Sequence, residues 1–316
     1  MEPTTPVALV SSRELEVFGR LLAMLAVLLV GTGLRASGVL DARRTARLNE
    51  LTYFVALPAL IFVSTYDRSI ARLASPTLLG GLAAVVLATA GVALVVHRNR
   101  PSSRRRSVAI VQSYHSNLGY LGLPLVAATF DADVTAIASV VLGVVSLVQV
   151  PLTVLVLVFA NDASTSLGRE LGRLARNPVL IALTAGLVVG SSGLEAPGPA
   201  VTVLDVVGAL ALPLALLCVG ASLQVDLPGV DVGAVGSVVA LKICLMPVLA
   251  WLVFSALAVD AATFTAAVVM LGTPTAVSTF VFATELGGDP EFASLNVFAS
   301  TLVSMATLFV LIALVG

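Results

Sequence analysis

The chain has 316 residues, of which 58% are hydrophobic and only 11% are charged, and its mean hydropathy is +1.06. A water-soluble protein of this size would lack the polar surface needed to cover its core, so the composition excludes that class. The formal net charge of −1 says little about partners, and no basic tract predicts nucleic-acid binding.

Apolar stretches long enough to cross a lipid bilayer recur along the whole chain. The polar, glycine and proline residues between them predict an all-α membrane protein with ten helical spans. The first span is expected to be a retained helix, because no basic segment of the kind that starts a signal peptide precedes it. The predicted spans are residues 15–35, 45–65, 75–96, 106–130, 134–160, 178–194, 199–223, 232–258, 262–286 and 290–314.

Two halves of the chain share residues at a constant offset of 155 positions. Ala56-Leu57-Pro58 recurs as Ala211-Leu212-Pro213, and Glu50 has its counterpart in Asp205. This predicts two copies of a five-helix unit. Because five is an odd number, the second copy must enter the membrane from the opposite side, as in transporters with inverted repeats. The predicted first repeat, connector and second repeat are residues 15–160, 161–177 and 178–316.

Basic residues predict the orientation in the membrane. The loops after spans 1, 3 and 5 carry twelve arginines, and the other face carries three or four. Cytoplasmic loops carry the excess of basic residues, so the 161–177 connector is expected in the cytoplasm and both termini outside the cell membrane. The twelve are Arg35, Arg43, Arg44, Arg47, Arg98, Arg100, Arg104, Arg105, Arg106, Arg169, Arg173 and Arg176.

Proline and glycine interrupt spans 4 and 9 at corresponding places. Each interruption alone is typical of a structural kink, but their recurrence beside polar residues favours a binding site. We interpret them as two broken helices that cross within the membrane and direct half-helix N-termini at an anionic group. The candidate substrate-binding residues are Asn117, Gly119, Gly122, Pro124, Thr273, Pro274, Thr275 and Ser278, with Gln149 and Thr279 as further neutral contacts.

Four passages in this order resemble the auxin efflux carrier family, which includes plant PIN-type carriers and bacterial malonate and malate permeases. The likeness to the bile acid symporter and PIN-like fold implies crossed helices 4 and 9, and a scaffold with a transport domain that moves as an elevator. It also implies a carboxylate substrate and a homodimer. The passages are Asn117-x4-Gly122-x-Pro124, Arg176-Asn177-Pro178, Lys242-x4-Pro247, and Val281 to Glu285 with Pro290, Ser294 and Phe298.

Within this resemblance Asn117 corresponds to a substrate ligand, and Pro124 and Pro274 correspond to the crossover prolines. The chain lacks the long cytoplasmic loop that plant carriers have between spans 5 and 6. That difference favours a prokaryotic dicarboxylate or another small organic anion over auxin as the substrate.

Four ionisable residues are candidates for coupling or charge compensation. Lys242, the only lysine, lies inside span 8, where it is either a substrate- or proton-linked charge or half of an ion pair with Asp205. Glu50 and Asp205 stand near span starts, where an interfacial and a functional role are both open. His115 is either a carrier of the coupling proton or a hydrogen-bonded structural histidine.

These features predict a secondary transporter of small organic anions, with proton coupling as one option. The alternatives are a sodium-coupled symporter of the bile acid type and, in another class, a non-transporting membrane receptor. No His-Glu-x-x-His or Gly-x-Ser-x-Gly motif is present, so no enzyme activity, metal site or cofactor is predicted. Cys218 and Cys244 are expected to be buried packing residues.

Overall fold

The computed structural model describes residues 12–163, 167–194, 196–222 and 231–315. The N-terminal residues 1–11, whose side of the membrane was predicted, and residues 164–166 of the predicted connector lie outside the described part. Six helical segments within that part are long and apolar enough to cross a membrane, and four shorter apolar helices accompany them. The protein is an all-helical membrane protein, as its composition predicts.

Each predicted span coincides with one helix or with successive helices, which in spans 4 and 9 are separated by non-helical residues; π-helical turns are labelled η. The first half contains α1 (Ser12–Ala36), α2 (Ala42–Leu51), η1 (Thr52–Ala56), α3 (Leu57–Thr65), α4 (Ile70–Leu73), α5 (Pro76–His97), α6 (Ser103–Tyr114), η2 (Leu118–Gly122), α7 (Leu123–Thr129) and α8 (Ala132–Asn161). The second half contains α9 (Leu167–Ala175), α10 (Pro178–Ser192), α11 (Gly198–Ala209), α12 (Ala211–Ser222), α13 (Val232–Val239), η3 (Ala240–Leu245), α14 (Met246–Ala256), α15 (Ala261–Leu271), α16 (Ser278–Glu285) and α17 (Pro290–Val315).

Prolines explain the irregular turns inside these spans. Pro58, Pro124 and Pro247 each lie in the first turn of an α-helix that directly follows η1, η2 or η3. A proline ring clashes with the carbonyl four residues earlier, and a wider turn relieves that clash. In the second half Pro213 follows a break at Leu210, between α11 and α12. The repeated Ala-Leu-Pro therefore marks a distorted turn in both halves.

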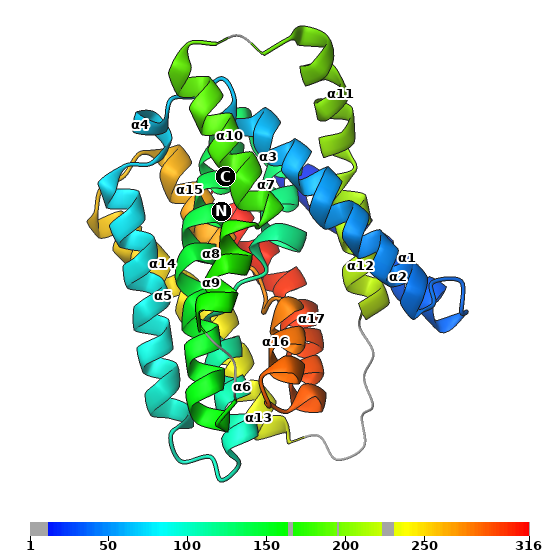
Figure 1. Cartoon of the computed structure of the whole chain (residues 1–316), viewed down its shortest axis with the longest axis vertical. Coiled ribbons are helices and arrows are strands. Elements are labelled where there is room, and N and C mark those ends of the chain that lie inside the picture. The colour runs from blue at the N-terminus through cyan, green and yellow to red at the C-terminus, as the bar shows by residue number, and fades with distance from the viewer. Residues whose placement is uncertain (1–11, 164–166, 195, 223–230, 316) are drawn as a thin grey trace, which may run out of the picture.

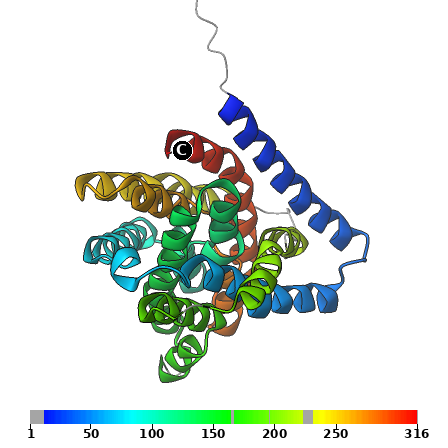
Figure 2. The same ribbon diagram turned by 90° about the horizontal axis from the view of Figure 1, so that it is seen from above.

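The helices pack as two groups. Figures 1 and 2 show α1, α2 and α12 together at one side of the molecule. With α3, α10 and α11 they form the first group, in which α1 packs on α12, and α10 and α11 pack on α3. The second group contains α5, α6, α8 and α13 to α17, with α8 packed against α6 and α15. We call these the arm group and the bundle group.

Hydrogen bonds at one end of the bundle join the start of α6 to the loop that follows α16. The guanidinium of Arg104 donates to the carbonyl of Gly288 at 2.9 and 3.1 Å, and Arg105 pairs with Asp289 at 2.9 Å. Asn161, at the end of α8, donates to the carbonyl of Leu286 at 3.2 Å. Since α6 begins where α16 ends, these two helices run in opposite directions.

Large apolar side chains are exposed on the outer surface of several helices. Val95, Val206 and Leu252 are each about 60% exposed, which suits contact with lipid rather than with water. Cys218 is buried as expected, but the expectation for Cys244 is wrong, because Cys244 lies on the exposed side of η3.

The arm group is held by a close helix contact between α1 and α12. A Cβ atom added at Gly31 would lie 2.5 Å from the carbonyl oxygen of Leu217, so only glycine permits this approach. The hydroxyl of Thr32 crosses the contact and donates to the carbonyl of Gly220 at 3.0 Å. Small residues and interhelical hydrogen bonds of this kind stabilise helix pairs in membranes.

We expect Gly31→Ala to destabilise the arm group, by about 1–3 kcal/mol, because the new methyl group overpacks the contact. Gly33→Ala is the matched control, since Gly33 is exposed on the same helix and an added Cβ would meet nothing within 4 Å. Thermal unfolding in detergent measures the difference. Equal unfolding midpoints for the two variants would show that α1 does not depend on this contact.

Candidate functional site

Two unwound stretches meet inside the bundle group. Residues 115–117 separate α6 from η2, and residues 272–277 separate α15 from α16. Ser116 and Thr275 pair as an isolated antiparallel bridge between the two stretches. The sequence predicted both interruptions, although in span 4 the unwound part lies before Gly119, Gly122 and Pro124 rather than at them.

Backbone hydrogen bonds hold the two unwound stretches together. The amide of Asn117 donates to the carbonyl of Pro274 at 2.8 Å, and the amide of Ala276 donates to the carbonyl of His115 at 3.0 Å. Non-helical backbone at membrane depth is stable only where its polar groups find partners in the protein or in a water-filled cavity. Each stretch therefore supplies hydrogen-bond partners for backbone groups of the other. We call the paired residues 115–117 and 272–277 the crossing.

Polar side chains from neighbouring helices complete the crossing. The side-chain amide of Gln149, on α8, accepts from the amide of Ser116 at 3.0 Å and donates to its carbonyl at 3.3 Å. Ser300, on α17, accepts from the amide of Thr275 at 3.3 Å. All of these residues are buried, so the bonds replace those that water would make.

The protein covers the carbonyl ends of the two half-helices that run into the crossing. The hydroxyl of Thr275 donates to the carbonyl of Gln112 in the last turn of α6, at 2.7 Å. The amine of Lys242 donates to the carbonyl of Leu271, at the end of α15, at 2.9 Å. The carbonyl ends, which carry the negative pole of the helix dipole, are thus occupied by internal donors.

The amide ends of the other two half-helices face a cavity of about 310 Å³. Leu118 and Gly119, in the first turn of η2, and Ser278, the first residue of α16, line it. The first N–H groups of a helix have no partner within the helix and carry its positive pole. The amides of Leu118, Thr279 and Phe280 donate to nearby carbonyls. The two helix starts nevertheless bring positive potential to the cavity, which suits an anion.

The cavity lies between the arm group and the bundle group. Tyr53 and Leu57 line it from span 2, and Asn177 and Val179 from the start of α10, all on the arm side. The bundle side contributes the crossing, the α8 residues Leu142, Ser146, Gln149 and Val150, and the α16 residues Ser278, Val281, Phe282 and Glu285.

Asn117 is the unsatisfied polar group of this cavity. Its side chain is only 3% exposed and lines the cavity, yet its Nδ2 has no hydrogen-bond partner among the described residues. A buried donor without a partner costs free energy, about 1–3 kcal/mol. A bound acceptor group would remove that cost.

The predicted substrate-binding residues divide into two sets. Asn117, Gly119 and Ser278 line the cavity, as does the coupling candidate His115. The rest do not line the cavity: Thr273, Pro274 and Thr275 belong to the crossing, whereas Gly122 and Pro124 lie in the helical turns that follow it. A Cβ at Gly122 would lie 2.9 Å from the sulfur of Met270. The residues of this second set are Gly122, Pro124, Thr273, Pro274 and Thr275.

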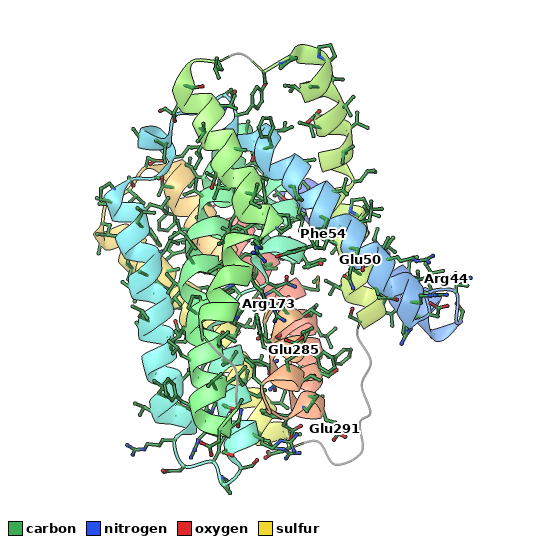
Figure 3. All side chains as sticks on the ribbon, viewed as in Figure 1. Arg44, Glu50, Phe54, Arg173, Glu285 and Glu291 are labelled. Carbon is green, nitrogen blue, oxygen red and sulfur yellow. The ribbon has the colours of Figure 1, made fainter. Side chains whose placement is uncertain are left out.

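Three of the four ionisable candidates lie outside the cavity lining. Lys242 is fully buried, and no carboxylate among the described residues lies within ion-pair distance of its amine. Asp205, the partner suggested by the sequence, is exposed on α11. Glu50 is exposed on α2 (Figure 3). The fourth, His115, bonds the Thr153 hydroxyl through Nδ1 at 2.8 Å.

Sequence reasoning missed the charged pair of the cavity. Arg173, on α9, and Glu285, at the end of α16, both line the cavity and approach each other to 3.5 Å (Figure 3). They are its only Arg, Lys, Asp or Glu side chains among the described residues. One signal was available: residues 278, 281, 282 and 285 have the spacing of a single helix face.

We expect Gln149→Leu to lower stability, because it leaves the buried amide and carbonyl of Ser116 without partners at about 1–3 kcal/mol each. Ser146→Ala is the control, one helical turn earlier on α8 and on the same cavity wall. The thermal unfolding midpoint in detergent reports the effect. A Gln149→Leu variant as stable as the control would mean that another group replaces the glutamine.

The bond between Lys242 and the carbonyl of Leu271 replaces the expected ion pair with Asp205, and this structural role can be separated from a functional one. If the lysine acts as a cap of α15, we expect Lys242→Met to lower the unfolding midpoint, because the carbonyl of Leu271 loses its donor. If the lysine acts on the substrate or on a coupling proton, uptake falls while the midpoint stays. A stable and fully active Lys242→Met variant would contradict both roles.

Comparison with known proteins also identifies a membrane transporter. The family described as "Membrane transport protein" matches residues 16–167 and again residues 165–312, so its pattern occurs twice along the chain. An "Uncharacterized transporter" of Methanothermobacter thermautotrophicus is 26% identical over 295 residues, which are 91% of this chain and 94% of that protein.

A "Putative malonate transporter" of Rhizobium meliloti is 31% identical over 136 residues, which are 43% of this chain and 42% of that protein. The two family matches together span nearly all of the described residues, and both relatives bear transporter names. These results agree with the motifs that the sequence shares with the auxin efflux carriers and with the absence of a catalytic motif. The chain belongs to this membrane transport protein family, that of the auxin efflux carriers, and it is a transporter rather than an enzyme.

Proposed function

We propose that the protein is a secondary active transporter of small organic anions that binds a carboxylate at the crossing. The observation that carries this proposal is the unpaired Nδ2 donor of Asn117, buried in the cavity beside the amide ends of η2 and α16. A carboxylate accepts such hydrogen bonds without a full countercharge. The relative named for malonate supports a carboxylate substrate.

The proposed topology is ten helices in two inverted five-helix repeats, residues 15–160 and 178–316, joined by the connector 161–177. The antiparallel bridge at the crossing and the opposite directions of α6 and α16 support the inversion. The arginine excess supports a cytoplasmic connector and termini on the opposite side.

Elevator-type alternating access agrees with the two helix groups. In this proposal the arm group is the scaffold and the bundle group carries the crossing past it. A cavity with one wall from each group changes its exposure when the groups slide. The mouth formed by Arg173 and Glu285 lies on the connector side, where both side chains are more than half exposed. If the connector is cytoplasmic, as proposed, the cavity opens to the cytoplasm in this conformation.

Two questions of mechanism follow from the site. His115 belongs to the crossing, and its imidazole is bonded to the Thr153 hydroxyl, so it is our candidate for proton coupling. Sodium coupling, as in the bile acid symporters, is the alternative. The homodimer implied by the family resemblance stays a prediction.

We expect Asn117→Ala to abolish uptake without loss of expression or folding, because the variant removes the donor and leaves the backbone of the crossing intact. The assay is uptake of radiolabelled malonate, malate and indole acetate into proteoliposomes, with a proton gradient, a sodium gradient or neither. Asn99→Ala is the control, because it makes the same chemical change in the exposed turn after α5. Undiminished uptake by Asn117→Ala would remove Asn117 from the binding site.

A further inference from the structure

The charged pair stands apart from the rest of the cavity. Arg173 Nη1 lies 3.5 Å from Glu285 Oε2, and the side chains are 60% and 52% exposed. An ion pair with this exposure contributes little to stability, because water solvates both charges well. Because the pair lines the cavity and adds little to stability, we consider a role in substrate recognition.

One helix face connects the pair to the crossing. Ser278 begins α16 at the crossing, and Glu285 ends the same face seven residues later, about 10 Å along the axis at 1.5 Å per residue. Val281 and Phe282 lie between them on this face and line the cavity. From the crossing to the mouth, the cavity thus presents amide donors, then apolar side chains, then a guanidinium.

This order matches a molecule with an anionic group at each end of a short apolar chain. We propose that Arg173 recognises the second carboxylate of a short dicarboxylate whose first carboxylate binds at Asn117, and that Glu285 holds Arg173 until the substrate displaces it. The inference rests on the proposed transport of organic anions; the family resemblance already implies a dicarboxylate, and what the inference adds is the roles of Arg173 and Glu285. It makes Arg173 the residue that distinguishes dicarboxylates from monocarboxylates.

The two members of the pair have opposite effects in this scheme. The guanidinium fork of Arg173 binds a carboxylate through two parallel hydrogen bonds. Glu285 offers a competing carboxylate and repels the substrate's own negative charge. Loss of the arginine therefore weakens dicarboxylate binding, whereas loss of the glutamate strengthens it. A purely structural ion pair would make both losses act alike.

The test compares dicarboxylates with their monomethyl esters, which keep the carbon chain and lose one charge. Radiolabelled malonate, succinate and glutarate and their half-esters are taken up into proteoliposomes by the full chain and its variants. The variants are Arg173→Gln, Arg173→Lys and Glu285→Gln. Arg98→Gln is the control for charge, because Arg98 is exposed at the end of α5 and does not line the cavity.

We expect the wild type to favour at least one dicarboxylate over its half-ester, and Arg173→Gln to raise the KM of that dicarboxylate about tenfold or more. The KM of the half-ester should stay within about twofold. Arg173→Lys should restore part of the preference, and Glu285→Gln should lower the dicarboxylate KM. Arg98→Gln should behave as the wild type does.

Several results would overturn the inference. One is a change of the same sign in Arg173→Gln and Glu285→Gln; another is an equal change for dicarboxylates and half-esters. A wild type that transports half-esters but no dicarboxylate would also overturn it, and would leave the proposed function standing. A wild type that transports neither would instead reject the proposed function. If Arg173→Gln does not fold, Glu285→Gln alone decides the sign.

Discussion

Backbone hydrogen bonding at the crossing is the constraint on which the rest of the structure depends. Non-helical backbone inside a bilayer cannot form hydrogen bonds with water, so every N–H and C=O group that leaves the helix needs a partner in the protein or at a cavity. Residues 115–117 and 272–277 solve this by pairing with each other and with Gln149 and Ser300. Internal donors bond carbonyls at the ends of α6 and α15, and the side-chain Nδ2 of Asn117 is left without a partner at the cavity.

The cavity has one wall from the arm group and one from the bundle group. The crossing belongs to the bundle group, whereas Tyr53 and Asn177 close the cavity from the arm group. The arm is fixed by a backbone contact at Gly31 that leaves no room for a side chain. The strongest helix contacts lie within one group or the other, which is what the proposed movement of the two groups as bodies requires.

Periodicity and punctuation in the sequence were enough to find the spans and both interruptions, since apolar length and proline chemistry act locally. The sequence patterns misplaced the unwound part of span 4. The π-helical turn before Pro124 accommodates the proline, and the helix is interrupted earlier, at residues 115–117. The sequence also could not predict the hydrogen-bond partner of Lys242, because every residue has a backbone carbonyl. The pairing of Arg173 with Glu285 joins residues 112 positions apart, which only the tertiary fold brings together.

A transported ion must leave its site as readily as it enters, and this explains the distribution of charge. A buried cation at the crossing would hold a carboxylate strongly and would be costly to leave unpaired once the anion departed. The buried Lys242 beside the crossing donates to the carbonyl of Leu271 and does not line the cavity, so the donors that face the cavity at the crossing are neutral amides. The one guanidinium of the lining stands at the exposed mouth, where water and Glu285 can replace the substrate. In the proposed function, neutral donors deep in the cavity and a charged side chain near its exposed side would let the cavity select an anion without binding it too tightly.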